Sequence, residues 1–142
     1  MSEHTEPARQ THRQTGTAGD WLAARDAETP AELRARVRAA VDRTPDAGST
    51  AATLVTAAIT CMEEALAHTR VAAAGSRERA EDEASVRAEA LAPFRPARAA
   101  ALPLLAADAL LTYAAEAASE HGSSLDDLSS DVNRRLAALL GE

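Results

Sequence analysis

Residues 50–69, which read TAATLVTAAITCMEEALAHT, carry the strongest structural signal in the sequence. With 100° between successive residues of a helix, eight side chains, seven of them apolar, fall within an arc of roughly 140°. The members of this arc are Leu54, Val55, Ala58, Ile59, Met62, Ala65, Leu66 and Thr69. An apolar arc this wide can contact two neighbouring helices, so the stretch predicts a core helix of a bundle.

Helical patterns also occur on both sides of this stretch. Asp20 is a candidate cap for a short helix that would anchor through Trp21. Thr29, followed by Pro30 at the first helical position and by Glu32, is typical of a capped helix start. In a helix running to about Glu120, the leucines at 102, 104, 105, 110 and 111 project around nearly the whole circumference, as expected of the central buried helix of a bundle. A last helix is capped by Ser123 and Ser124 and carries Leu125, Leu128, Val132, Leu136 and Leu139 on one side.

No segment alternates with period two for long enough to form a strand. We therefore predict an all-α fold, an up-and-down helical bundle of four to five helices spanning residues 20–142. Residues 1–19 mix polar and charged side chains without periodicity and predict a disordered N-terminal tail.

Two breaks in the middle of the chain leave alternatives open. Residues 76–89 are charged on every side, and either a separate helix begins at Ser76 or the preceding helix continues through Gly75. One glycine inside a helix costs only about 1 kcal/mol, so Gly75 does not decide between them. Pro103 either starts the following helix or kinks it in its second turn, and Gly122 ends it.

The composition predicts a thin core. The chain has 142 residues and a formal charge of −7, and 37 of its 65 apolar residues are alanine. Leu, Ile, Val and Phe together make up only 16% of the chain. Alanine favours helix but buries little area, so we expect that pairing of two copies supplies the burial that one copy lacks.

Several classes of protein are disfavoured by charge and patterning. The isoelectric point near 5.1 argues against nucleic-acid binding. We expect Arg34, Arg36, Arg38 and Arg43 to form solvated helix surface rather than a phosphate-binding stripe. The longest uncharged stretches, residues 47–62 and 99–107, are shorter than a membrane span. With no signal-peptide pattern and one cysteine, Cys61, the chain is expected to be cytoplasmic and not membrane-bound.

Asp108 is the first candidate for chemistry. By helical projection it lies on an apolar face between Leu104 and Leu111, next to Thr112. A buried carboxylate needs a partner, so we expect either an ion pair with an arginine or a small-ligand pocket formed with Thr112 and Tyr113.

A second candidate is a metal site made of Glu64, His68, Glu116 and Glu120. Ferritin-like bundles bind iron through Glu and Glu-x-x-His ligands on facing helices, and iron, manganese or zinc would suit these side chains. The spacing here is Glu-x-x-x-His, however, which does not meet that motif. The alternative is a surface Glu64–His68 pair beside a core cysteine, Cys61.

The sequence contains no glycine-rich phosphate loop, no H-E-x-x-H motif and no nucleophile elbow. We therefore expect a non-catalytic interaction or regulatory module that forms a homodimer and binds a protein partner. The alternatives are the ferritin-like metal-binding bundle and a sensor domain with a ligand pocket around Asp108.

Overall fold

The computed structural model describes residues 16–80 and 94–141, and their side chains over 16–75 and 99–141. The elements are α1 (Ala18–Ala23), a 3-10 helix η1 (Asp26–Glu28), α2 (Ala31–Arg43), α3 (Thr50–Ala80), α4 (Phe94–Glu120) and α5 (Leu125–Leu140). No strand occurs in these two ranges. The predicted all-α fold is confirmed.

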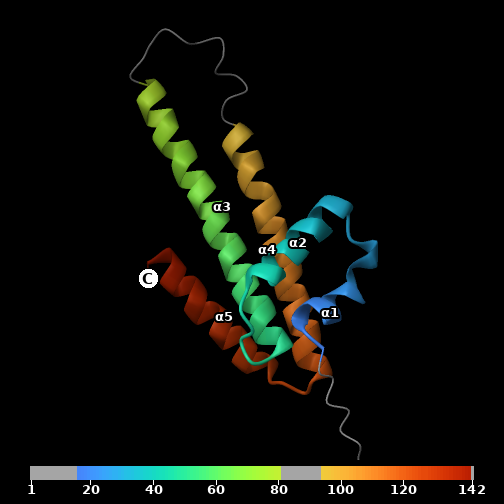
Figure 1. Ribbon diagram of the computed structural model, residues 1–142. Helices are drawn as coiled ribbons and strands as arrows, with labels where there is room; N and C mark the ends of the chain where they lie inside the picture. The colour runs from blue at the N-terminus through green and yellow to red at the C-terminus, as the bar shows by residue number, and fades with distance from the viewer. Residues whose placement is uncertain (1–15, 81–93, 142) are drawn as a thin grey trace, which may run out of the picture.

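An antiparallel pair of long helices, α3 and α4, forms the body of the molecule (Figure 1). The segment from α1 to α2 covers one side of the lower half of this pair, and α5 lies on the other side. The upper parts of α3 and α4 extend beyond both coverings. The core therefore sits in the lower half, where all the helices meet.

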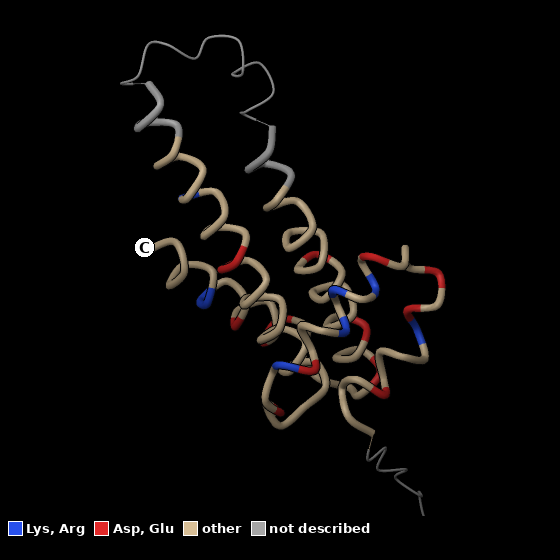
Figure 2. Tube along the Cα trace, turned by 45° about the horizontal axis from the view of Figure 1, so that its top comes forward, with Lys and Arg blue, Asp and Glu red and all other residues tan. Residues whose placement is uncertain are grey.

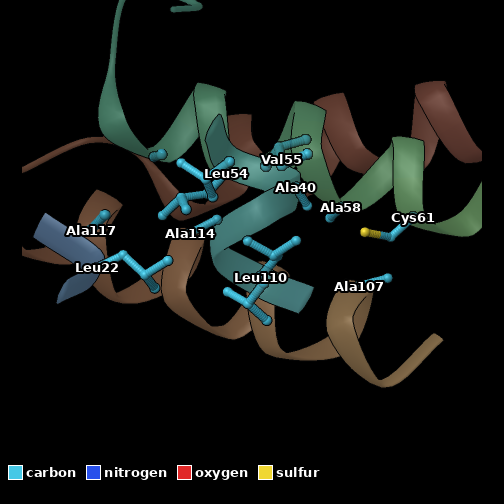
Figure 3. Packing of buried hydrophobic residues seen from close by; sticks show 14 of the residues in the cluster. Leu22, Ala40, Leu54, Val55, Ala58, Cys61, Ala107, Leu110, Ala114 and Ala117 are labelled. Carbon is cyan, nitrogen blue, oxygen red and sulfur yellow. The ribbon is translucent and has the colours of Figure 1, made fainter. Parts of the chain in front are cut away.

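Alanines repeat every seven residues along the seam between α3 and α4. In α3 these are Ala51, Ala58, Ala65 and Ala72, and in α4 they are Ala100, Ala107 and Ala114. All are buried except Ala72, which is half-buried. A repeat of seven returns to the same face after two turns, and small side chains let two helices pack closely. Figure 3 shows Cys61 of α3 beside Ala107 of α4 on this seam.

The core is thin, as the composition predicts. Eleven of the nineteen buried apolar residues among the described side chains are alanine. The large side chains that are fully buried are few, and the apolar ones are Leu22, Leu54, Leu110, Val37 and Val55, with Cys61. Trp21, 8% exposed, anchors α1 to this cluster as expected.

Two predicted helix starts are wrong in detail. The first helix begins at Ala18, inside the predicted tail, because Thr17 is the N-cap and Asp20 completes a capping box. The cap of α2 lacks a side-chain hydrogen bond, since the Thr29 hydroxyl lies 3.0 Å from the Tyr113 hydroxyl instead. Ser124 does cap α5, accepting from the N–H of Asp127.

The structure also shows which of the alternatives at Gly75 and Pro103 is correct. Helix α3 continues through Gly75 to Ala80, and α4 contains Pro103 in its interior. Gly122, with φ of +67°, follows the end of α4 as predicted. Residues 1–15 of the predicted tail and residues 81–93, which include most of the charged segment, lie outside the described residues.

Helices α3 and α4 have the length and apolar composition of membrane spans. The two segments are Thr50–Gly75 and Ala99–Glu120. The expectation that no stretch is long enough to span a membrane holds only for strictly uncharged runs. The two segments also contain charged residues, such as Glu63 and Glu64 in α3 and Asp108 in α4. Core helices of soluble proteins share these properties. Here the two helices form the packed centre of the bundle.

Candidate functional site

The expectation that Asp108 is buried is wrong. The core face of α4 consists of Ala106, Leu110 and the alanine repeat, whereas Leu104 and Asp108 are exposed on the opposite face. The helical projection therefore identified the neighbours of Asp108 on α4 correctly, but it wrongly placed the face that they share in the core. Large apolar side chains suggested the core, and the alanines actually form it.

Thr112 and Tyr113 do not join Asp108 in a pocket. Thr112 is exposed, and its hydroxyl donates to the Asp108 carbonyl oxygen at 3.1 Å. Tyr113 is half-buried, and its hydroxyl meets Thr29 on the η1 side. With 100° per residue, Tyr113 lies about 140° around the helix from Asp108. The two side chains thus leave α4 in different directions.

The four predicted metal ligands do not converge. Among the described residues there is no group of three or more His, Cys, Asp or Glu side chains that could hold a metal ion. Glu64 forms an ion pair with Arg36 and lies 3.8 Å from Nε2 of His68. Glu116 is exposed on α4, while Glu120 is engaged near Trp21.

Glu120 fastens α1 to the end of α4. Its carboxylate accepts from Nε1 of Trp21 at 3.0 Å and from Arg25 at 2.5 Å. Arg25 also lies over the Trp21 ring, 4.0 Å from the centroid. Hydrogen bonding to Arg25, then to Trp21, lowers the pKa of Glu120 below its ordinary value. The arrangement is a structural clamp, because both carboxylate oxygens of Glu120 accept hydrogen bonds from side chains of the α1 segment.

An ion pair between the buried Asp26 and the exposed Arg38 joins η1 to α2. The Asp26 carboxylate accepts from Nε and Nη2 of Arg38 at 2.6 and 2.7 Å, and Asp26 is 1% exposed. Hydrogen bonding to Arg38 lowers the pKa of Asp26 despite its burial. Arg36 was predicted to be solvated surface, and this is wrong, because its side chain is only 21% exposed and pairs with Glu64. Arg38 also pairs with an acidic residue, but its side chain is 47% exposed, so it does lie at the surface.

Cys61 is buried at the seam, as predicted for a core cysteine. Burial raises the pKa of its thiol, although nearby Arg36 acts in the opposite direction. A thiol with a raised pKa and no access to solvent is a poor nucleophile. The interpretation of Cys61 as a packing residue therefore fits its surroundings.

A cavity of about 560 Å³ lies where the ends of the first four helices meet. Its polar lining includes Asp42, Thr53 and His121. The Thr53 hydroxyl donates to the Ser49 carbonyl and accepts from the backbone N–H of Ala47, and Nδ1 of His121 is 2.6 Å from the Ala117 carbonyl. Thr53 and His121 therefore have partners within the chain. None of the site candidates from the sequence line this cavity.

The most distinctive surface feature is exposed leucine. Only three of the fourteen leucines whose side chains are described are buried, namely Leu22, Leu54 and Leu110. Large apolar side chains are more than half exposed at Val71 on α3, at Leu104 and Leu105 on α4, and at Leu125 and Leu140 on α5. Residues 99–107 of α4 carry no charged side chain, and Figure 2 draws this part of the helix in tan. Three of these residues lie on the α3–α4 pair and two lie at the ends of α5.

No protein-family model, curated protein or solved structure matches the chain.

Proposed function

We propose that the chain is a self-associating helical module that forms a homodimer and presents helical surfaces to a protein partner. The observation that carries the proposal is that small apolar residues are buried while most of the large ones are not. Alanine fills most of the core, while eleven of the fourteen described leucines remain at least partly exposed.

Leucine is normally among the most buried residues, and contiguous exposed apolar surface marks interaction sites. Complete burial of one leucine side chain contributes about 1.5–3 kcal/mol. A single copy forgoes roughly half of this contribution at each of Leu104, Leu105, Leu125 and Leu140, which are 51–64% exposed. Association of two copies would recover part of it, which supports a homodimer.

Native mass spectrometry of chelator-free protein tests the proposal, because one spectrum reports subunit number and retained metal. We expect a dimer without bound metal, and a melting temperature that rises with protein concentration. A monomer at every concentration, with a concentration-independent melting temperature, would overturn the proposal. Iron, manganese or zinc at a fixed ratio would favour the metal-binding alternative instead.

A further inference from the structure

The two coverings of the α3–α4 pair are attached to it in different ways. Ion pairs fasten the segment from α1 to α2, with Arg25 on Glu120 of α4 and Arg36 on Glu64 of α3. This segment also contributes two buried apolar residues from α1 and three from α2 to the core. Helix α5, on the other side of the pair (Figure 1), has no buried residue. The second covering is therefore less firmly attached than the first.

Few contacts join α5 to the rest of the bundle. Leu128 and Val132 are half-buried and pack against the core cluster. Among the described residues, one side-chain hydrogen bond connects α5 to another element, from Arg135 to the Thr56 hydroxyl of α3 at 3.0 Å. The leucines at the two ends of α5 are more than half exposed. The attachment therefore depends on the partial burial of a few apolar side chains and on one hydrogen bond.

The ion pairs of α5 lie within the helix itself. Asp131 pairs with Arg134 and Arg135, which are three and four residues further along the chain. Pairs at this spacing stabilise a helix whether or not it touches a neighbour. In the described part of the chain, no ion pair joins α5 to another element. Separation of α5 from the bundle therefore breaks none of its ion pairs.

The two helices that meet at the last turn are capped independently of each other. At the end of α4, the N–H of Ser123 donates to the Ala118 carbonyl oxygen at 2.8 Å, next to Gly122, whose φ is +67°. At the start of α5, the Ser124 hydroxyl oxygen accepts from the N–H of Asp127 at 3.2 Å. The chain can change direction between these caps without releasing the backbone hydrogen bonds of either helix.

We propose that α5 is a detachable covering, which leaves the bundle by rotation about the connection at Ser123 while α1 to α4 remain folded. The molecule then alternates between a closed state, which covers part of an apolar stripe on α5, and an open state, which exposes all of it. The inference concerns contacts within one chain and does not rest on the proposed self-association. The stripe consists of Leu125, Leu128, Val132, Leu136 and Leu139.

Opening of the other covering costs more. It separates Arg25 from Glu120 and Arg36 from Glu64, and it exposes Leu22, which is 0% exposed in the bundle. Local openings of a folded protein range in free energy from near zero to that of global unfolding, and elements with few buried apolar contacts lie at the low end. Of the two coverings, α5 is therefore the one that opens first.

Amide hydrogen exchange of the wild-type chain is the first test. We expect the amides of α5 to exchange at least about tenfold faster than those of α2, because they exchange through a smaller opening. Low urea should change the exchange of α5 little and accelerate that of α2, since the response to urea scales with the surface exposed. Mass spectrometry of peptides from residues 125–140 and 31–43 measures both. Equal protection of the two helices, with equal urea dependence, would overturn the inference.

The second test is a matched pair of substitutions in α5. Val132→Asp places a carboxylate where α5 packs against the core, whereas Ser130→Asp places one at an exposed position of the same helix. We expect Val132→Asp to accelerate exchange in α5 further, because burial of a carboxylate disfavours the closed state. The urea midpoint followed by Trp21 emission should stay nearly unchanged, since Trp21 belongs to α1. Ser130→Asp should alter neither signal.

The outcomes of the second test are distinct. Faster exchange confined to α5 in Val132→Asp, with the Trp21 midpoint retained, would support the inference. Loss of protection throughout the described helices of Val132→Asp would overturn it, because α5 would then be an integral part of the core. Equal effects of Val132→Asp and Ser130→Asp would also overturn it. Native mass spectrometry reports subunit number separately, so a monomer would overturn the proposed function and leave the detachment of α5 standing.

Discussion

Arg38 holds the buried carboxylate of Asp26 through two hydrogen bonds, with Nε 2.6 Å from Oδ2 and Nη2 2.7 Å from Oδ1. This pair connects η1, the short segment after α1, to the middle of α2. Because Asp26 has almost no contact with solvent, its charge depends on Arg38 for compensation.

Loss of Arg38 alone should therefore be more damaging than loss of both partners. We expect Arg38→Met to lower the urea midpoint of unfolding clearly, because it leaves a buried carboxylate unpaired. Adding Asp26→Asn to that variant should restore part of the loss. Arg43→Met, at an exposed arginine of the same helix, is the control. Equal losses in Arg38→Met and Arg43→Met would contradict the structural role.

The buried Asp26 carboxylate should make the free energy of unfolding depend on pH in the acidic range. The pKa of Asp26 lies below its ordinary value of 3.8 in the folded chain, since Arg38 stabilises the charged form. Its contribution is therefore complete above the unfolded-state pKa and is lost as the pH falls through the lower folded-state pKa. We expect the free energy of unfolding to decrease below about pH 4. Asp26→Asn should flatten this decrease, and an unchanged acid profile would contradict the assignment.

Enlarging a seam alanine should destabilise the bundle. Ala107→Leu inserts extra atoms between α3 and α4, where Ala107 is 1% exposed, and should cost about 1–3 kcal/mol of unfolding free energy. Ala101→Leu makes the same chemical change on the exposed side of α4 and should have little effect. Urea denaturation measures both. If the two variants are equally stable, the helices are not closely packed at this seam.

The clamp on α1 can be followed through the single tryptophan. Glu120→Gln weakens the acceptor for Trp21 Nε1 and removes the charge that pairs with Arg25. We expect red-shifted Trp21 emission and stronger quenching by acrylamide, because α1 then separates more often from α4. Glu116→Gln, an exposed residue one turn earlier, should leave both signals unchanged. An unaffected spectrum in Glu120→Gln would show that the clamp does not hold Trp21 in place.

Helical periodicity predicted the all-α fold and the core stretch around Leu54 and Val55 from the sequence. It placed Asp108 wrongly because the core face of α4 is formed mostly by alanine, whereas several of its leucines are exposed. The signal that could have corrected it was present in the sequence, as alanines at seven-residue spacing in both long helices. If these alanines are taken as the packing face of α4, helical periodicity predicts that Asp108 faces solvent.

Partners distant in sequence could not be predicted in the same way. Glu120 was a plausible metal ligand until Trp21 and Arg25, about a hundred residues earlier, were found to occupy its carboxylate. Thr29 had the local pattern of a helix cap, yet Tyr113 of α4 takes its hydroxyl. Such contacts depend on how the helices are placed, and local spacing does not encode that.

The alanine seam also has a thermal consequence. The heat capacity of unfolding rises with the apolar area that becomes exposed, and an alanine exposes far less of it than a leucine. A core in which eleven of nineteen buried apolar residues are alanine should therefore unfold with a small heat-capacity change for its length. The curve of stability against temperature is then shallow, so cooling the protein alters its stability less than it would in a leucine-filled bundle.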